Sequence, residues 1–479
     1  MFDADLDAAV PMLCVALAAL FSMGAEAFRS KGERMPIGWL GILGLAGAGI
    51  TSGLLWNRNA ESFGVIVADN FGLFITVTLV IVGILTIMFS SQVVERDAMP
   101  KGEYYALVLF SIVGMIMMAT ANDLLVIFVA LEILSLSVYV LTGIRRDSAK
   151  GTEAAFKYFL LGAFSSAFFL YGIAFTYGVT GSTRLPAIGS FLAAQSLTEN
   201  PLTLVAMGLL LVGFAFKISA VPFHMWTPDA YEGAPAIVTG FMSTGVKAAA
   251  FAAFVRVFLS AFEPFVAEWA PVVAVIAALT MLLGTIVGVA QSNLKRMLAY
   301  SSIAHGGYLL VGLVSANAVG KAAILFYLLA YSVTNLAAFG VIALLGSRDQ
   351  ANDELRDYRG LWHSHPALAA LMTICLLSLG GLPPTAGFIG KWYIFSAAVS
   401  AGYYTLAIVG VLTSVISVFF YLRVVVMMYM SEREGATVPA PVGAVGMVAL
   451  AISIAGIFYL GLLPARIIDF AAESIATIF

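Results

Sequence analysis

Four ionisable side chains lie inside long apolar stretches of this 479-residue chain: Glu132, Lys217, Lys247 and Lys391. Glu132 is about 13 Å along a helix that would begin near Asp123. A charge at the centre of a bilayer costs about 2.5–3.5 kcal/mol, so such residues are normally paired and functional. Because burial and a nearby glutamate act in opposite directions on a lysine's proton affinity, the four residues predict reversible proton binding. The alternative is a fixed Glu132–Lys217 ion pair that only orients helices.

Three other ionisable residues are weaker candidates for the same chemistry. Lys157 lies near the end of its apolar run, where it could extend to the membrane surface instead. His224 lies just past a proline, and His305 closes the segment Ser-Ser-Ile-Ala-His. Either histidine could relay protons or simply pack against a neighbouring helix. Arg256 and Arg423 lie nearer the ends of their runs and are expected to anchor helices.

The composition places these residues in a membrane protein. Hydrophobic residues make up 61% of the chain and charged residues only 11%, whereas a soluble domain carries about 25% charge. The net charge of -3 argues against nucleic-acid binding. Cys14 and Cys375 are far apart, which excludes a disulfide framework and a thiolate-ligated cluster. No helix-spaced histidine pair suits haem or a metal, so we expect no metal site and no redox cofactor in this chain.

Apolar runs of about 20 residues predict an all-α polytopic protein with fourteen transmembrane helices. The runs lie near 10–28, 37–56, 71–90, 103–121, 124–144, 154–179, 202–235, 236–259, 271–290, 298–315, 320–346, 366–401, 404–430 and 441–462. Fourteen Lys and Arg residues fall in loops on one side and four on the other. Since basic residues accumulate on the cytoplasmic side, both termini are expected outside.

Two of these runs are too long for one crossing. Residues 202–235 contain Pro222, and residues 366–401 contain Pro383 and Pro384, so each run should be a discontinuous helix. They are the seventh and twelfth spans, which suggests that spans 4–8 and 9–13 form an inverted repeat typical of secondary transporters. The expected segments are 1–102 with three helices, 103–260 and 261–430 with one five-helix unit each, and 431–479 with the last helix.

Three motifs resemble a known family. Residues 221–235, Val-Pro-Phe-His-Met-Trp-Thr-Pro-Asp-Ala-Tyr-Glu-Gly-Ala-Pro, closely resemble a signature of the antiporter-like subunits of respiratory complex I. Residues 295–305, Lys-Arg-Met-Leu-Ala-Tyr-Ser-Ser-Ile-Ala-His, and residues 381–384, Gly-Leu-Pro-Pro, look like its other marks. The signature and the lone Lys391 are most similar to subunit N of NADH:quinone oxidoreductase, although Ile237 departs from a proline often found there.

This resemblance implies proton translocation in a membrane arm, with Glu132 modulating Lys217, Lys247 passing protons laterally and Lys391 on the exit side. Lys157 would be auxiliary. It also implies a non-redox subunit of an enzyme, with flavin, iron–sulfur clusters and quinone reduction in other subunits. The implied partners are other membrane-arm and peripheral subunits, lipid, protons and water. High Ala and Gly usage and the lack of a transit peptide favour a bacterial inner membrane. The alternatives are a subunit of a multisubunit cation/proton antiporter, a purely structural membrane-arm subunit and a quinone-binding chain.

Overall fold

The computed structural model describes residues 6–28, 37–194, 201–346, 353–432 and 442–478. Apart from a hairpin of β1 (Ala60–Ser62) and β2 (Ile66–Ala68), every regular element is helical. The first helices are α1 Val10–Ala27, α2 Ile37–Leu55, α3 Asn70–Arg96, α4 Lys101–Thr120, α5 Leu124–Thr142, α6 Ala149–Thr180, α7 Leu185–Ala193, α8 Leu202–Lys217, α9 Trp226–Gly233 and α10 Ala236–Phe241. The π-helical turns η2 Met242–Val246 and η3 Val257–Ala261 flank α11 Lys247–Arg256.

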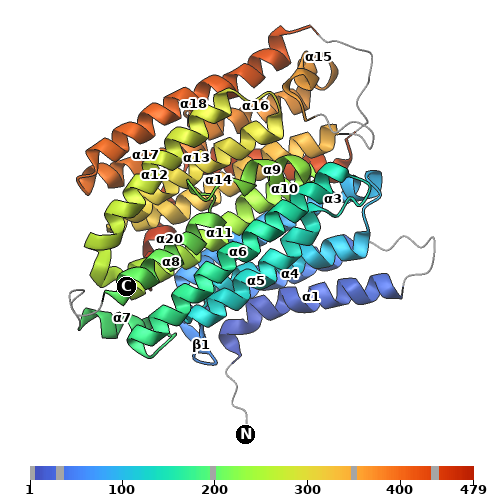
Figure 1. Cartoon of the computed structure of the whole chain (residues 1–479). Helices are drawn as coiled ribbons and strands as arrows, with labels where there is room; N and C mark the ends of the chain where they lie inside the picture. The colour runs from blue at the N-terminus through green and yellow to red at the C-terminus, as the bar shows by residue number, and fades with distance from the viewer. Residues whose placement is uncertain (1–5, 29–36, 195–200, 347–352, 433–441, 479) are drawn as a thin grey trace.

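The remaining helices complete one bundle (Figure 1). They are α12 Val266–Val289, α13 Leu294–Ser315, α14 Ala318–Leu345, α15 Leu361–Ser364, α16 Pro366–Gly380, α17 Ala386–Ser400, α18 Tyr404–Met430, α19 Ala444–Leu462 and α20 Ala465–Ile475, with short 3-10 turns at Asp7–Ala9, Glu263–Phe265 and Leu355–Tyr358. Within the described residues, twelve helices are long and apolar enough to cross a membrane, and α8 and α16 are shorter apolar helices. The predicted all-helical polytopic architecture is confirmed.

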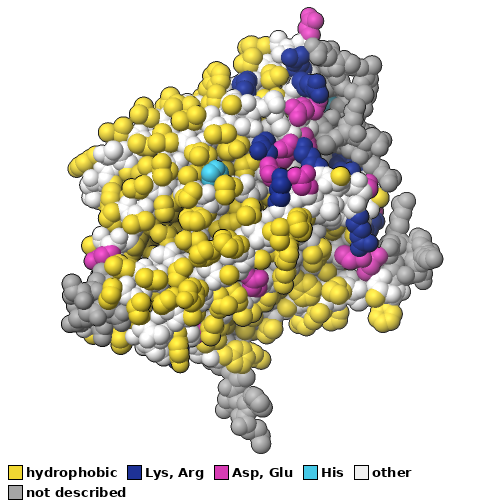
Figure 2. Space-filling model, in the orientation of Figure 1, with side chains coloured by type: hydrophobic (Ala, Val, Ile, Leu, Met, Phe, Trp, Pro, Cys, Tyr) yellow, Lys and Arg dark blue, Asp and Glu magenta, His cyan; other side chains and the backbone are white. Residues whose placement is uncertain are grey.

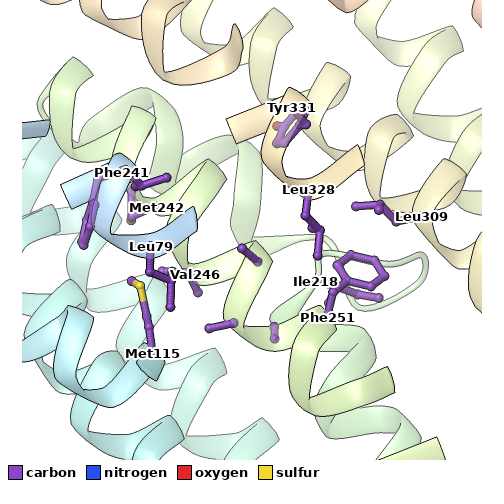
Figure 3. Close-up of a cluster of buried hydrophobic side chains, with 14 of the residues drawn as sticks. Leu79, Met115, Ile218, Phe241, Met242, Val246, Phe251, Leu309, Leu328 and Tyr331 are labelled. Atoms are coloured by element: carbon purple, nitrogen blue, oxygen red, sulfur yellow. The ribbon is translucent and has the colours of Figure 1, made fainter. Parts of the chain in front are cut away.

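Burial separates the helices at the centre of the bundle from those at its edge. Nearly every residue from α10 to η3 and along α13 and α14 is buried, whereas fewer than half of the residues of α1, α2 and α19 are buried. Figure 1 shows α14 inside the bundle, with α1 and α18 at opposite edges. A central cluster of apolar side chains joins α3 and α4 to α13 and α14 (Figure 3). Its labelled members are Leu79, Met115, Ile218, Phe241, Met242, Val246, Phe251, Leu309, Leu328 and Tyr331. The central helices are therefore the ones that can hold charges away from lipid.

Both long apolar runs are interrupted, as the prolines predicted. Helix α8 ends at Lys217 and α9 begins at Trp226, while α16 ends at Gly380 and α17 begins at Ala386. Polar contacts replace some of the lost helical hydrogen bonds. The Trp226 Nε1–H donates to the Phe216 carbonyl at 3.0 Å, and the Val221 N–H donates to the hydroxyl of Thr280 at 2.9 Å. The first break is therefore held by neighbouring protein groups.

Several details differ from the sequence prediction. The interval 180–201 contains the short helix α7 instead of only a loop. The predicted span 236–259 is not a regular α-helix, because η2 interrupts it immediately before Lys247. A second C-terminal helix, α20, follows α19, and the β-hairpin precedes α3.

The predicted anchor residues Arg256 and Arg423 do tie helices together. Arg256 forms a two-point ion pair with Asp69, with N–O distances of 2.7 and 2.8 Å, and also donates to the Ala119 carbonyl. Both charged side chains are only 4% exposed. Arg423 donates to the carbonyls of Val289 and Gln291 at the end of α12. Arg256 thus links α11 to α3 and α4, and Arg423 links α18 to α12.

Candidate functional site: a line of buried lysines

Lys217 is the last residue of α8, immediately before the first break, and only 4% of it is exposed. Its Nζ donates a hydrogen bond of 2.6 Å to the Ser135 hydroxyl on α5. The rings of Tyr139 and Tyr158 lie beside the ammonium, with centroids 5.7 and 5.6 Å from Nζ. A cation is stabilised over an aromatic face, so α5 and α6 provide a partly compensating cage for this charge.

Glu132 does not form the direct ion pair that the sequence left open. Its carboxylate accepts a 2.5 Å hydrogen bond from the Ser166 hydroxyl on α6, and no Glu132–Lys217 pair occurs within the part of the chain that the structure describes. Ser135 lies one helical turn beyond Glu132 on the same face of α5. A cavity of about 10 Å³, close to the size of one water molecule, is lined by Ser166, Tyr139 and Lys217 among others. The glutamate and lysine therefore share a polar site without touching.

Lys247 begins α11 directly after η2 and is 2% exposed. Its Nζ donates to both the carbonyl and the hydroxyl of Ser302 on α13, the hydroxyl at 2.6 Å. Gly306 gives the room for this arrangement, because a Cβ there would lie 3.1 Å from the Ile218 carbonyl oxygen and 3.7 Å from Nζ of Lys247. Ile218 follows Lys217 in the chain. The first break and the second lysine therefore meet at Gly306.

His305 continues the line beyond Lys247. It is 3% exposed and lies one turn after Ser302 on α13. Its Nδ1 is 2.6 Å from the Tyr327 hydroxyl, and its Nε2 is 3.3 Å from the Tyr421 hydroxyl. The Tyr421 hydroxyl also bonds to the Ser301 hydroxyl. An imidazole between two phenols can accept a proton on one nitrogen and release one from the other.

Lys391 lies on α17 after the second break and is 5% exposed. Its Nζ donates to the carbonyls of Leu379 and Gly380 at 2.9 and 3.0 Å, and to the Ser414 hydroxyl at 2.8 Å. These carbonyls lie at the C-terminal end of α16, where the helix dipole favours a cation. Gly381 has φ +82°, and a Cβ there would lie 2.8 Å from Cδ of Lys391. The break thus creates the site that holds this lysine.

Lys157 and His224 lie apart from this line. The Nζ of Lys157 contacts Glu153 at 2.7 Å and Asp229 at 2.9 Å, in a half-exposed charged network. Arg296 joins that network through Asp229 at 2.7 Å. Charged side chains gather over one end of the molecule, while most of the visible surface is hydrophobic (Figure 2). His224 is half-buried in the segment between α8 and α9, so the structure brings His305 to the lysines and leaves His224 outside.

The residues that sequence reasoning missed are the hydroxyl partners of the lysines. They are Ser135, Ser302 and Ser414, with Tyr139, Tyr158, Tyr308, Tyr327, Tyr331 and Tyr421 around them. The only sequence signal was local: Ser135 falls one turn after Glu132, and Ser302 one turn before His305. In the described residues, Lys217, Lys247 and Lys391 have no carboxylate partner within ion-pair distance. Hydroxyls, carbonyls and aromatic faces can hold a lysine in either protonation state more readily than a fixed carboxylate would.

Comparison with known proteins identifies the family. The family model described as NADH:quinone oxidoreductase/Mrp antiporter, TM, matches residues 121–417. NADH-quinone oxidoreductase subunit N of Trichlorobacter lovleyi is 45% identical over 479 residues, covering 99% of this chain and 98% of the relative. The corresponding subunit of Chloroflexus aggregans is 41% identical, covering 99% and 98%.

Solved structures show the same fold. A chain of respiratory complex I from Thermus thermophilus with bound aureothin aligns with a TM-score of 0.80 and 35% identity, covering 96% of this chain and 99% of that one. A chain of the Mrp complex from a Dietzia species has a TM-score of 0.84 at 23% identity, covering 99% and 97%, and is similar in fold alone. The chain therefore belongs to the NADH-quinone oxidoreductase subunit N family.

Proposed function

We propose that this chain is a proton-translocating membrane-arm subunit of NADH:quinone oxidoreductase. The observation that carries the proposal is the buried line of Lys217, Lys247, His305 and Lys391, in which each cation is held by hydroxyls, carbonyls or aromatic rings. A structural role alone would be served as well by apolar packing. The free energy that moves protons along this line would come from NADH oxidation and quinone reduction in neighbouring subunits.

The proposed proton path runs laterally through the centre of the bundle. A proton taken up from the cytoplasmic side reaches Lys217, whose affinity depends on the charge of Glu132 three helical positions from Ser135. It then passes to Lys247, which lies near the first break at Gly306. From Lys247 it moves through Ser302 and His305, and it leaves through Lys391. A charged cavity of about 130 Å³ at one end of the bundle, lined by Glu232, Lys295 and Asp353 among others, supports water access on that side. Lys157 and His224 keep an auxiliary place in this proposal.

The finer topology is part of the same proposal. The broken pairs α8–α9 and α16–α17 would each cross once, so that with the twelve long helices the chain crosses fourteen times. Two inverted five-helix units, 103–260 and 261–430, would then each contain one break and the lysine next to it. The first three helices, 1–102, and the last segment, 431–479, would flank these units. Both termini would lie on the periplasmic side of a bacterial inner membrane.

The position of Glu132 supports the proposal that another subunit packs against this chain. It is half-buried, nine residues after Asp123 on α5, and its carboxylate faces α6 through Ser166. Figure 2 shows acidic side chains within the otherwise hydrophobic face of the bundle. Because a carboxylate facing lipid is unfavourable, a neighbouring membrane subunit is expected to cover this site. Such contact would also let the neighbour change the charge state of Glu132.

The chain would act as a non-redox part of the enzyme. Flavin and iron–sulfur clusters would belong to other subunits. In the described residues, no group of three or more His, Cys, Asp or Glu side chains could hold a metal ion.

The second candidate function is a multisubunit cation/proton antiporter, favoured by the fold likeness to the Mrp complex. Co-purification with NADH-oxidising peripheral subunits after mild detergent extraction distinguishes the two.

The test of the proposed function is Lys247→Met in the assembled complex. Methionine keeps the side-chain length and burial but cannot carry a proton, so we expect proton pumping in inverted membrane vesicles to fall several-fold. The control is Arg184→Met, because Arg184 is a surface cation 53% exposed, is paired with Glu61 and lies outside the proposed proton path; it should pump normally. Wild-type pumping by Lys247→Met, with assembly confirmed on a native gel, would rule out a proton-carrying role for this residue and favour a structural subunit.

A further inference from the structure

A groove of about 540 Å³ lies on the flank of the bundle, outside the lysine line. Helices α2, α3, α4 and α19 form it. Its lining is mainly apolar: Ile37, Gly38, Trp39, Ile42, Ile84, Ile87, Met88, Tyr105, Ala444, Val445 and Val448, with Ser91, Glu95 and Lys101. The volume lies within the range of sites that enclose small molecules. The groove plays no part in the proton path.

Along α3, its longest wall, the groove is about as long as one membrane leaflet is deep. On α3 it extends from Glu95 to Ile84, eleven residues, which is about 16 Å of helix. Half of a bilayer's hydrocarbon core is about 15 Å. The polar residues Ser91, Glu95 and Lys101 lie together at the end where α3 meets α4, and the deeper lining is apolar. One end of the groove therefore suits a headgroup and the rest suits an acyl chain.

Glu95 and Lys101 lie at the polar end of the groove, which we call its mouth, and their charges select between lipid headgroups. Lys101 Nζ contacts the Glu95 carboxylate, and the two side chains remain 27% and 61% exposed. Lys101 offers a cation to a phosphate, and Glu95 offers an anion to an ammonium group. A lipid with a net negative headgroup would satisfy Lys101 but would be repelled by Glu95. A zwitterionic amine headgroup satisfies both. Trp39, 61% exposed at the same end, is a residue type enriched at membrane interfaces.

We propose that this groove is a binding site for one phosphatidylethanolamine molecule, with an acyl chain between α2 and α19, its phosphate on Lys101 and its ammonium on Glu95. Burial of each methylene group contributes about 0.8 kcal/mol relative to water, but lipid already surrounds the protein. The selectivity must therefore come from the mouth and from the fit of the groove. The bound lipid would fill the gap between α2 and α19 on the surface of α3.

The experiment uses the intact complex, extracted in mild detergent and incubated with a photoactivatable phosphatidylethanolamine that carries its reactive group on the acyl chain. Peptides containing Ile42 or Val448 should be labelled. Val448→Trp fills the groove and should remove most of the labelling. Ile452→Trp is the matched control: Ile452 lies one turn further along α19, is 50% exposed like Val448 at 51%, and does not line the groove. Both variants change exposed positions, so the complex should assemble normally.

Two charge variants test the headgroup assignment. Lys101→Gln should weaken competition by unlabelled phosphatidylethanolamine about fivefold, since one lysine near a lipid headgroup contributes about 1 kcal/mol. Glu95→Gln should let phosphatidylglycerol compete as well as phosphatidylethanolamine. Equal competition by the two lipids in the unmodified complex would overturn the headgroup assignment. Equal labelling of Val448→Trp and Ile452→Trp would overturn the lipid site itself.

Discussion

Replacing Lys217 with methionine is expected to abolish proton pumping by the assembled complex, with a loss of roughly tenfold or more. Removing a positioned proton donor or acceptor typically costs 10²–10⁴-fold in rate, and part of that loss can be hidden by other steps. Lys217 is the first lysine that a proton meets in the proposed path. Its Nζ has only the Ser135 hydroxyl and two aromatic rings as close partners among the described residues.

Related variants separate a proton carrier from a structural cation. Lys217→Arg keeps the charge but holds its proton permanently, so it should assemble well and still fail to pump. Glu132→Gln should slow pumping less than Lys217→Met, because the glutamate acts on the lysine only through space. Ser135→Ala should give an intermediate effect, since it removes the 2.6 Å hydrogen bond but leaves both charges. The order of effects is itself a prediction.

The measurement is the pH gradient formed by inverted membrane vesicles during NADH oxidation, with an uncoupler added afterwards to check for leak. Assembly is checked on a native gel, and Arg184→Met serves as the surface-cation control because its side chain is about half exposed and outside the proposed path. If Lys217→Arg pumps like the unmodified complex, a positive charge alone is sufficient and the proton-carrying role is wrong. If Lys217→Met fails only because the complex does not assemble, Lys217→Arg still gives the answer.

The sequence was sufficient for the charged residues and the helix breaks because both are costly inside a membrane. A lysine such as Lys391 and a diproline such as Pro383–Pro384 stand out against an apolar background, and the structure places them next to each other. The partners of the lysines were not predictable. Serine is common in apolar helices because its hydroxyl can bond to its own backbone, so Ser302 carries no distinguishing signal. Which serine meets a lysine depends on how α11 packs against α13.

Other features of the fold could not be predicted from the sequence, for different physical reasons. The π turn η2 preserves the apolar pattern of the run 236–259, so hydropathy cannot detect it. Helix α20 has only 11 residues and is amphipathic, with Arg466, Asp469 and Glu473 between apolar residues, so it gives no apolar run long enough to cross a membrane. The position of His224 relative to the lysines could not be predicted, because a histidine beside a proline break can point to either side of the chain. Only the packing of α8 and α9 decides which.

Replacing Arg256 with methionine is expected to destabilise the subunit by about 3–5 kcal/mol, the usual cost of leaving one member of a buried ion pair uncompensated. Asp69 would remain 4% exposed with its partner removed. The loss should appear as a lower thermal midpoint of the assembled complex, or as loss of this subunit at a lower denaturant concentration. Arg184→Met is the matched control, because the Arg184–Glu61 pair is about half exposed and such pairs are worth about 1 kcal/mol or less.

A second substitution distinguishes an uncompensated charge from simple loss of packing. Asp69 also caps α3 through a 2.7 Å hydrogen bond from the Gly72 N–H, and asparagine caps a helix about as well as aspartate. The double variant Arg256→Met with Asp69→Asn therefore removes both charges but keeps the cap, so it should recover much of the lost stability. Equal stability of Arg256→Met and Arg184→Met would show that the buried pair does not anchor α11. Recovery in the double variant would show that α11, which carries Lys247, is held to α3 and α4 by charge compensation at Asp69.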